Sequence, residues 1–422
     1  MHAIEKIMAR AAGEKEVTTG QIVNCRIDIA GINDLYLQTV RSFEEMGGIK
    51  VAAPDRVIVF FDHYAPASTI IQAENHKHFR TFCSQQGIEQ LCDVNCGVCH
   101  QVLADRGMSS PGKIMVVTDS HTTTHGAFGA FGTGVGATDM GVILSTGSLW
   151  FRVPEIIRIN LEGELGPGVS AKDLILHIIG KLGADHAVYK AVEFCGPLLK
   201  RLSISERMAL CNMTTEMGAK TSYIQPDDIT FDFLREKGVE KFETFFTDPD
   251  FSYAGEYNFN ATGLTPRVAA PHSVDNVFPL EDYAGTRIDQ AYLGTCTGGR
   301  VEDIASAAKV LGGRKIHPEV RFLVVPASKD VLLEAMAMGH IQTLVQAGAT
   351  LVSPGCAACL GTHQGMLTDS EVCITSANRN FPGRMGDTGA KIFLSSPASV
   401  AAAAVAGEIV DPSPYFVTGR PL

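Results

Sequence analysis

The sequence predicts an α/β protein made of two or three lobes. The chain has 422 residues, which is longer than one hydrophobic core usually supports. Short apolar runs bounded by turn residues alternate with helical patterns, as in repeated βα units. Several of the apolar runs are followed at once by reactive side chains, and that edge of an open α/β sheet is where ligands bind.

Five apolar runs predict buried strands that end at one common site. They cover residues 56–61, 113–118, 291–294, 350–353 and 372–376. One run followed by reactive residues has a structural explanation, but five together favour a convergent site. The side chains that follow these runs are Asp62-His63, Asp119-Ser120-His121, Cys296, Cys356 and Asn378-Arg379-Asn380.

Helices are expected between these strands. Residues 1–17 predict a short amphipathic helix stopped by Gly13, with no apolar core of a signal peptide. Residues 67–86, 305–311 and 329–337 are amphipathic, and each segment is closed by glycine. These helices are interpreted as scaffold.

The composition is that of a globular enzyme of the cytoplasm. Hydrophobic residues make up 45% and charged residues 19% of the chain. No run of eighteen apolar residues is present, so no membrane span is expected. The formal net charge is −11 and no basic stripe offsets it, which argues against nucleic acid as a partner. Eleven cysteines in such a chain favour a soft-metal or cluster site over a disulfide framework.

One candidate cluster site consists of Cys296, Cys356 and Cys359. These cysteines lie in the glycine-rich turns GTCTGGR and SPGCAACLG. Glycines let backbone amides approach the sulfur atoms of a cluster closely. Three thiolates suit a 4Fe-4S cluster with one iron left open, and an open iron acts as a Lewis acid. The alternative is a buried pair and a chance third cysteine, which the glycine context disfavours.

A second candidate is the spacing Cys92-x-x-x-Cys96-x-x-Cys99. It matches the cluster motif of radical SAM enzymes, which carry it near the start of a TIM barrel. The residues after Cys99 include no glycine-rich segment for binding SAM, so we prefer buried small residues with one or two free thiols.

Four motifs together resemble the aconitase superfamily. They are DSHTTTHGAFGAFGTGVGATDMG at 119–141, GTCTGGR at 294–300, SPGCAACLG at 353–361 and NRNFPGRMG at 378–386. The sequence is most similar to the split-subunit group that contains the large subunits of isopropylmalate isomerase and homoaconitase. The resemblance runs from the first helix to about residue 410. It implies an aconitase-type fold of three α/β lobes around a cluster, which we place at residues 1–125, 126–285 and 286–422.

The resemblance also implies roles for single residues. Cys296, Cys356 and Cys359 are expected to hold the 4Fe-4S cluster. In the pair Asp62-His63, the histidine is expected to protonate the departing hydroxyl, since a neighbouring carboxylate favours the imidazolium form.

Further site residues follow from the same motifs. Asp119 and His121 are expected on the water and iron side of the pocket, His100 is a further active-site histidine, and Glu193 is expected to hold iron-bound water. Asn378 is expected near the cluster. Arg379 and Arg384 are expected to bind substrate carboxylates, which a planar guanidinium grips through two hydrogen bonds.

Three features depart from the family pattern. Gly298 replaces the asparagine of the family's CTNGR turn, which removes one amide near the cluster. The segment DIAGINDLYLQT at 28–39 replaces a stretch in which a His-Asp or Asn-Asp pair is usual. Asn33 and Asp34 are the expected stand-ins for substrate binding. The swivelling domain that carries the family's catalytic serine is not recognised, so a separate small subunit is expected in a heterodimer or heterotetramer.

The expected function is that of a hydro-lyase acting on a malate-type dicarboxylate or a tricarboxylate, as isopropylmalate isomerase does. The same chemistry on homocitrate, 2,3-dimethylmalate, citramalate or citraconate, or maleate is the alternative, and the sequence leaves isomerase and simple dehydratase both open. A cluster-bearing RNA sensor is disfavoured by the negative charge. A non-catalytic scaffold is disfavoured because the cluster cysteines, His63 and both arginines are present.

Overall fold

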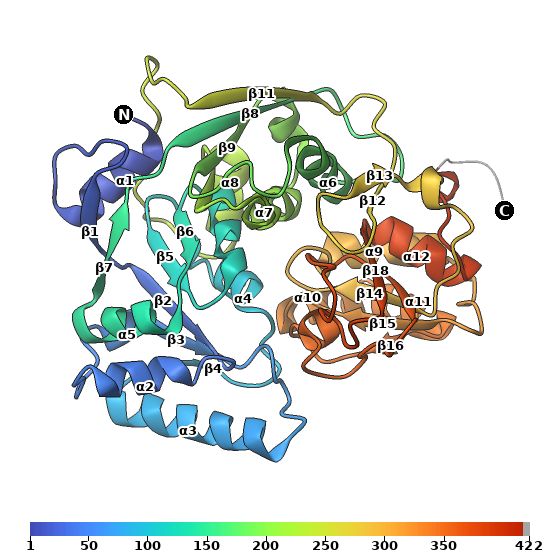
Figure 1. The fold of residues 1–422 in the computed structure, drawn as a ribbon, viewed down its shortest axis with the longest axis horizontal. Helices are drawn as coiled ribbons and strands as arrows, with labels where there is room; N and C mark the ends of the chain where they lie inside the picture. The colour runs from blue at the N-terminus through green and yellow to red at the C-terminus, as the bar shows by residue number, and fades with distance from the viewer. Residues whose placement is uncertain (417–422) are drawn as a thin grey trace.

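The computed structural model describes residues 1–416, which form three lobes, each built on one large β-sheet (Figure 1). The first sheet has the order β4-β3-β2-β5-β6, and all its strands are parallel. Its strands are β2 (Ile29–Asn33), β3 (Val57–Phe60), β4 (Gln90–Cys92), β5 (Ile114–Val117) and β6 (Phe131–Gly134). The helices of this lobe are α1 (Ala3–Ala12), α2 (Gln38–Glu45), α3 (Ile70–Gln86), α4 (Cys99–Asp105) and α5 (Ala137–Thr146).

The second sheet is also parallel, with the order β10-β9-β8-β11. Its strands are β8 (Ile156–Glu162), β9 (Ala191–Cys195), β10 (Thr221–Ile224) and β11 (Gly255–Asn260). The helices α6 (Ala171–Leu182), α7 (Ile204–Met213) and α8 (Asp228–Glu236) belong to this lobe. Helix α6 also packs against β12, β13 and β18 of the third sheet, so the second and third lobes share one hydrophobic core.

The third sheet has the order β13-β12-β18-β17-β14-β15-β16. The strands from β18 to β16 are parallel, whereas β12 and β13 are antiparallel additions at one edge. The strands are β12 (Arg267–Ala269), β13 (Val277–Pro279), β14 (Gln290–Gly294), β15 (Arg321–Val325), β16 (Thr350–Leu351), β17 (Val372–Thr375) and β18 (Lys391–Ser395). The helices are α9 (Val301–Leu311), α10 (Lys329–Ala337), α11 (His340–Ala347) and α12 (Pro397–Ala406).

The five expected strands are all present, but β16 covers only Thr350–Leu351 and is exposed at both positions, so the expected burial is wrong there. Two of the other strands show why the sequence folds in this way. Strands β3 and β5 are buried at every position, as continuous apolar runs are when helices cover both faces of a parallel sheet. A two-stranded antiparallel ribbon of β1 (Ile22–Arg26) and β7 (Ser148–Arg152) lies beside the first sheet.

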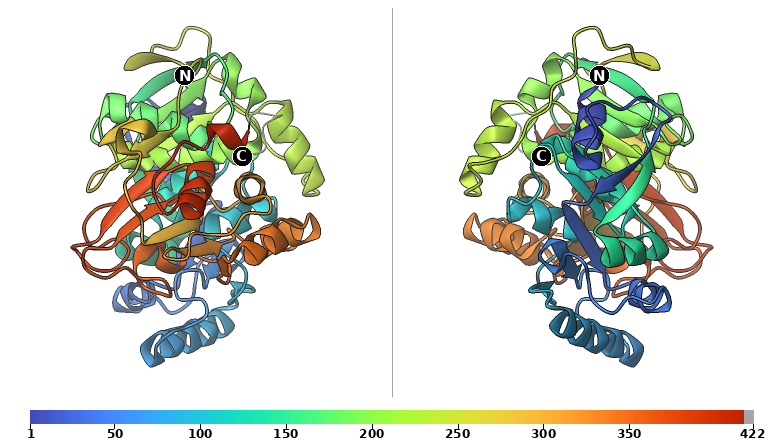
Figure 2. Two further views of the ribbon diagram at one scale, coloured as in Figure 1. Left: turned by 90° about the vertical axis from the view of Figure 1, so that its right-hand side faces the viewer. Right: turned by 90° about the vertical axis from the view of Figure 1, so that its left-hand side faces the viewer.

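The expected helices are also present, with two shifted starts. Helix α3 begins at Ile70 rather than at residue 67, because the Thr69 side chain caps the helix and Gln72 completes a capping box. It ends at Gly87 in the left-handed conformation (φ 71°) and lies at one extremity of the molecule in all three views (Figure 2). Helix α9 begins at Val301, before the expected residue 305, since Arg300 and Asp303 form its capping box.

The sheets group the chain differently from the expected lobe limits at residues 125 and 285, and those limits stay a prediction. β6 extends the first sheet to residue 134, and β12 begins the third sheet at residue 267. Within residues 1–416, the helices are too short or too polar to cross a lipid bilayer.

Candidate active site

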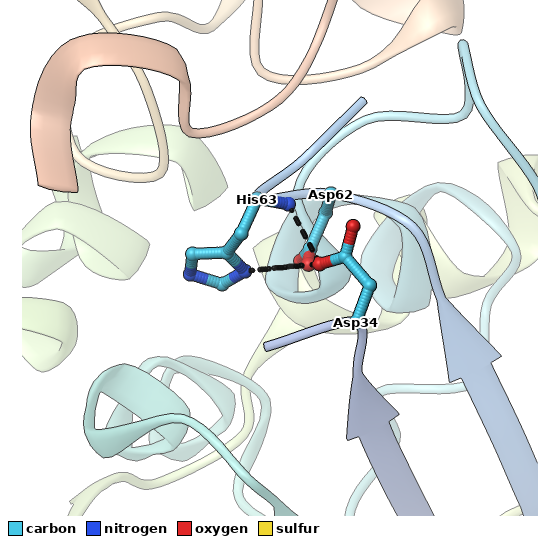
Figure 3. Close-up of side chains that lie close together, drawn as sticks. All are labelled: Asp34, Asp62 and His63. Carbon is cyan, nitrogen blue, oxygen red and sulfur yellow. Dashed lines mark hydrogen bonds and ion pairs between the residues drawn. The ribbon is translucent and has the colours of Figure 1, made fainter. Parts of the chain in front are cut away.

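The carboxyl edge of the first sheet brings three acidic residues together. Asp34 follows β2, Asp62 follows β3 and Asp119 follows β5, and these strands are parallel neighbours. His63 is buried at this edge, and Figure 3 shows it beside Asp34 and Asp62. The predicted convergence at the strand ends is therefore present in this lobe.

His63 contacts all three carboxylates. Its Nδ1 lies 2.7 Å from an Asp62 oxygen and 3.8 Å from an Asp34 oxygen, and its Nε2 lies 3.6 Å from an Asp119 oxygen. Burial disfavours the imidazolium, but the charges of Asp62, Asp119 and Asp34 outweigh it and raise the pKa of His63 to about 9. His63 therefore carries its proton at neutral pH, as a general acid must.

Asn33 and Asp34 hold this acid pair in place. The Asn33 amide donates to both Asp62 oxygens (2.9 and 2.8 Å) and accepts from the Thr118 hydroxyl (3.0 Å). Asp34 accepts from the backbone amide of His63 at 3.0 Å, and its second oxygen lies 2.9 Å from Nε2 of His76. Both side chains are completely buried and are committed to these partners. The geometry supports a positioning role for them rather than the expected contact with substrate.

Asp119 links the two other predicted histidines. One Asp119 oxygen accepts from the His121 backbone amide (2.8 Å) and lies 3.1 Å from Nε2 of His100. Burial alone would raise the pKa of Asp119, but His100 and His121 hold it well below its usual range. Asp119 caps a buried 3-10 helix at Ser120–Phe128, in which Gly126 lies so close to Ser222 of β10 that no side chain fits. This close packing holds the 3-10 helix in place, and with it Asp119, the partner of the two histidines.

Glu216 joins His121 to Arg379, and sequence reasoning missed it. One Glu216 oxygen lies 2.8 Å from Nε2 of His121 and accepts from Nε of Arg379, also at 2.8 Å. Burial on its own would raise the pKa of Glu216, but His121 and Arg379 lower the pKa by more than burial raises it. The carboxyl group of Glu216 is therefore ionised. Arg379 also donates to the Ser120 hydroxyl at 3.0 Å. The signal that could have revealed Glu216 is the polar spacing Asn212-x-x-x-Glu216 at a helix end.

The three predicted cluster cysteines converge opposite this edge. Cys296 follows β14, Cys356 follows β16, and Cys359 lies in a 3-10 helix at Ala357–Leu360. The pKa of the Cys356 thiol is raised well above its usual value, first by burial and then by the charges of Asp62, Cys359 and Cys296. Burial likewise raises the pKa of Cys296 to about 11. All three thiols are buried and lie outside any disulfide.

Polar groups around these thiols are suited to an inorganic cluster. Asn378 donates toward the sulfur of Cys296 (3.5 Å), and Arg384 donates toward the sulfur of Cys359 (3.6 Å). Nε of Arg384 and the hydroxyl of Thr295 are buried and lack hydrogen-bond partners in the described part of the chain. Orphaned donors beside converging thiols fit a group that accepts hydrogen bonds at this point.

Arg300 and Lys172 are further buried cations that sequence reasoning did not identify. Arg300 donates to the Gln101 side chain (3.1 Å) and to the backbone carbonyl of Cys296, and thus connects α4 to the cysteine turn. Lys172 donates to the carbonyl of Ala377 at 2.7 Å, just before Asn378. Burial lowers the pKa of Lys172 to about 8.

The glycine at position 298 has a packing reason. A side chain there would collide with Ser376, whose hydroxyl donates to the Gly294 carbonyl at 2.8 Å. The turn of Cys296 is thus closed by a serine hydroxyl from β17's end instead of by an amide at position 298.

Glu193 is not brought to this site. It lies on β9, where it contacts His2 (3.2 Å) and accepts a hydrogen bond from Tyr253. It lines a separate cavity of about 410 Å³ on the second sheet, together with Arg158 and Cys195. Among the described residues, Glu216 is the glutamate that contacts the active-site histidines.

The segment that carries Cys92, Cys96 and Cys99 lies next to the acid pair Asp62-His63. Cys92 ends β4, and Cys99 begins α4, where its backbone amide donates to Asp62 at 2.9 Å. The lobes are open sheets rather than the TIM barrel that the radical SAM alternative requires.

Comparisons with known proteins agree with the expected family. A family model described as the aconitase family (aconitate hydratase) matches residues 5–407. The 3-isopropylmalate dehydratase large subunit 1 of Methanopyrus kandleri is 46% identical over 98% of this chain and 99% of its own length. A probable methanogen homoaconitase large subunit of Methanosarcina mazei is 50% identical over 92% of this chain and 98% of its own length.

A solved structure is similar in fold. The crystal structure of Thermococcus kodakaraensis aconitase X in its holo-form matches with a TM-score of 0.52 and covers 89% of each chain, at 12% sequence identity. The aconitase-type fold expected from the motifs is thereby confirmed. Since the family model spans nearly the whole sequence and the relatives are full-length matches, the chain belongs to the aconitase family and is an enzyme of the hydro-lyase class.

Proposed function

We propose that this chain is the large, catalytic subunit of a 4Fe-4S hydro-lyase that removes water from a malate-type dicarboxylate or a tricarboxylate and adds it back. One observation carries the proposal. A protonated histidine, His63, is held by Asp62 and Asp119, and both carboxylates also act on the buried thiol of Cys356. A proton donor that faces a cysteine-lined metal site is what assisted loss of hydroxide requires.

Cys296, Cys356 and Cys359 are the residues that would hold the cluster. When bound, the cluster supplies a Lewis acid that weakens the carbon–oxygen bond of the substrate hydroxyl. The thiols must lose their protons to bind iron. Because the pKa values of Cys296 and Cys356 are raised, cluster binding releases protons and assembly is favoured at higher pH.

His63 is the proposed proton donor to the leaving hydroxyl. Asp62 fixes the ring through Nδ1 and leaves Nε2, which lies toward Asp119, to give up the proton. Asn33 holds Asp62 through both of its oxygens, so the donor's orientation is set by the end of β2.

Arg379 and Arg384 are the proposed carboxylate ligands. Glu216 fixes Nε of Arg379, while Nη2 of Arg379 donates to the exposed Ser120. Arg384 donates toward Cys359 through Nη2, and its Nε has no hydrogen-bond partner among residues 1–416. Two guanidinium groups, of which Arg384 contacts a cluster cysteine, would orient a substrate with two carboxylates.

A separate small subunit is the proposed partner. The relatives named above are large subunits by name, and this chain covers 98% or more of their lengths. The resemblance assigns the catalytic serine base and the swivelling domain to that partner. We infer a heterodimer or heterotetramer in which the base comes from the small subunit.

The test is anaerobic reconstitution of the chain with iron, sulfide and the small subunit encoded nearby. The mixture is assayed with isopropylmalate, homocitrate, citraconate, maleate and dimethylmalate, following absorbance of the unsaturated product. Turnover of one of these substrates, lost when the small subunit is omitted, supports the proposal. An intact cluster with no turnover of any of them would overturn it.

The relatives favour two of these substrates. Their names specify 3-isopropylmalate and homoaconitase chemistry, and both kinds match at similar identity. In this chain, Tyr36 lines a hollow of about 260 Å³ with Asp119 and Ser120, and it comes from the segment that departs from the family pattern. We infer that Tyr36 contributes to the choice of substrate, so Tyr36→Ala should change the ratio of kcat/KM between two substrates, whereas Tyr283→Ala, far along the third lobe, should leave it unchanged.

A further inference from the structure

Lys172 is a buried cation in a place that disfavours positive charge. Its side chain is 2% exposed, and it lies in the first turn of α6, where its backbone amide donates to the capping hydroxyl of Ser170 at 3.2 Å. Burying an ammonium group costs free energy, and the N-terminal end of a helix is the end at which the helix dipole repels a cation. Both costs would be offset by negative charge nearby.

The ammonium group of Lys172 is hydrogen-bonded but not neutralised. Its Nζ donates to the carbonyls of Ala377 (2.7 Å) and Ser376 (3.3 Å) and toward the sulfur of Met213 (3.5 Å), and all three partners are uncharged. Within residues 1–416, Lys172 forms no ion pair. Burial lowers the pKa of Lys172 to about 8, so most of the side chain is charged at neutral pH.

The acidic residues around Lys172 have other partners. Asp173, the next residue along the chain, accepts from the backbone amides of Ser170 (2.8 Å) and Arg267 (2.9 Å). Glu216 contacts an active-site histidine and an active-site arginine, and Asp303 completes the capping box of α9. The charge of Lys172 therefore has no dedicated counter-charge in the part of the chain that the structure describes.

The hydrogen bonds of Lys172 lead to the cysteine site. The two carbonyls that it contacts belong to the residues just before Asn378, whose amide donates toward the sulfur of Cys296 at 3.5 Å. One of these carbonyls, that of Ser376, also accepts from the hydroxyl of Thr297 at 3.0 Å, and Thr297 directly follows Cys296. Lys172, which comes from the second lobe, is thus connected to Cys296 of the third lobe by two short routes.

We propose that Lys172 is a buried counter-charge for the metal cluster. This inference rests on the proposed function, because it takes Cys296, Cys356 and Cys359 as the residues that hold the cluster. Three thiolates give such a cluster a net negative charge, and a buried ammonium group nearby attracts it strongly because the surroundings have a low dielectric constant. Lys172 should therefore raise the affinity for the cluster. It should also raise the reduction potential of the cluster, since reduction adds a further negative charge.

The experiment uses the full chain, loaded with iron and sulfide under anaerobic conditions. Lys172→Met and Lys172→Gln both remove the charge, but glutamine keeps a side-chain N–H donor for the two carbonyls. Lys172→Arg keeps the charge. Lys181→Met is the matched control, because Lys181 is an exposed lysine in the last turn of the same helix.

The midpoint potential of the cluster is measured by a redox titration followed by electron paramagnetic resonance. In Lys172→Met and Lys172→Gln, the ratio of reduced to oxidised cluster at a fixed potential should fall by about tenfold or more, which is about 59 mV for a one-electron couple. Lys172→Arg and Lys181→Met should keep the potential of the unaltered chain. The same potential in all of these forms would overturn the proposal.

Two further measurements separate charge from structure. Iron release to a chelator should be faster by about tenfold in both uncharged variants, because the bound cluster loses its counter-charge. Thermal unfolding of the cluster-free chain reports the lost hydrogen bonds, so Lys172→Met should unfold at a lower temperature than Lys172→Gln. The change in potential should nevertheless be the same in these two variants. A change in potential that follows thermal stability instead of charge would make Lys172 a structural residue and refute the counter-charge.

None of these measurements requires turnover, so the two proposals can fail separately. A chain that binds the cluster but whose potential is independent of Lys172 would overturn the counter-charge and leave the proposed function standing. A potential that depends on Lys172, in a chain that turns over no substrate, would support the counter-charge and overturn the proposed function. A chain that takes up no iron would overturn both.

Discussion

At the scale of single residues, the site depends on contacts between buried carboxylates and the histidines around them. His63 is surrounded by three acids, and Asp119 is surrounded by three histidines if His63 is counted. Burial on its own would neutralise His63 and Asp119. Their contacts with groups of opposite charge raise the pKa of His63 and lower that of Asp119, so both are charged.

His63 should set the alkaline limit of activity. Its protonated form is the active one, so activity in the dehydration direction should be present below its pKa and fall as pH rises through about 9. His63→Gln should lower kcat by about 10² to 10⁴-fold and abolish this limb. The exposed His78 offers a control, and His78→Gln should keep the wild-type pH profile. A kcat within twofold of wild type in His63→Gln would show that another group donates the proton.

Glu216 should act on substrate binding through Arg379. Glu216→Gln removes the charge that both His121 and Arg379 contact at 2.8 Å. KM should rise by about tenfold, because Arg379 is no longer held in a fixed orientation, and steady-state kinetics would measure this. Glu334→Gln, on the exposed face of α10, is the matched control. An unchanged KM would mean that Arg379 is oriented by other groups.

At the scale of elements, strand ends and the turns after them hold the chemistry. Cys296 depends on the turn between β14 and α9, which Ser376 at the end of β17 closes by hydrogen bonds to the backbone of Gly294. The turn therefore connects the ends of β14 and β17 by hydrogen bonds, and it also supplies Cys296 as a ligand.

Gly298→Ala should disrupt this connection between the ends of β14 and β17. The added methyl group collides with Ser376, so the free energy of unfolding should fall by about 1–3 kcal/mol and bound iron should be lost. Thermal unfolding and iron analysis measure both effects. Gly166→Ala, where no atom lies within 4 Å of the added carbon, is the control. The double variant Gly298→Ala, Ser376→Gly should recover most of the stability, and failure to do so would refute the collision with Ser376.

At the scale of the whole molecule, the first and third lobes are joined at the site. Arg300 connects the Cys296 turn of the third lobe to Gln101 on α4 of the first lobe. The 92–99 turn makes a second connection, in which Val98 donates to the Ala327 carbonyl at 2.8 Å. The site is therefore stable only while the lobes keep their relative placement.

Arg300→Met should loosen this connection. The buried side chain of Gln101 and the carbonyl of Cys296 would lose their donor, and the free energy of unfolding should fall by about 3 kcal/mol. Chemical denaturation measures the change. Arg201→Met, which removes an exposed ion pair with Glu164, should cost less than about 1 kcal/mol. Equal losses in the two variants would contradict the connecting role of Arg300.

Much of this architecture could be predicted from the sequence. Strands that are buried on both faces, such as β3 and β5, give uninterrupted apolar runs, and the parallel order then brings the residues after them to one edge. Asn33 and Asp34 were expected to meet substrate, but their side chains turn toward Asp62 and the backbone. Side-chain direction at a strand end depends on neighbouring strands, which a single sequence does not specify.

The two glutamates show the same limit. Glu193 matched a motif but lies on β9 against His2, on the second sheet. Glu216, in a helical segment with no glycine-rich motif, contacts the active-site histidine and arginine. Periodicity places a residue on an element, whereas the packing of α7 against the 3-10 helix after Asp119 decides which element reaches the site.

The partnership of His2 with Glu193 has a consequence for the order of events during synthesis. The imidazole that caps α1 is enclosed by residues that follow it by 191 positions and more, namely Glu193, Tyr223 and Tyr253. Helix α1 thus lacks these contacts until the segment that carries Tyr253 has left the ribosome. Nascent chains shorter than about 250 residues should leave this helix open to protease, and longer ones should protect it.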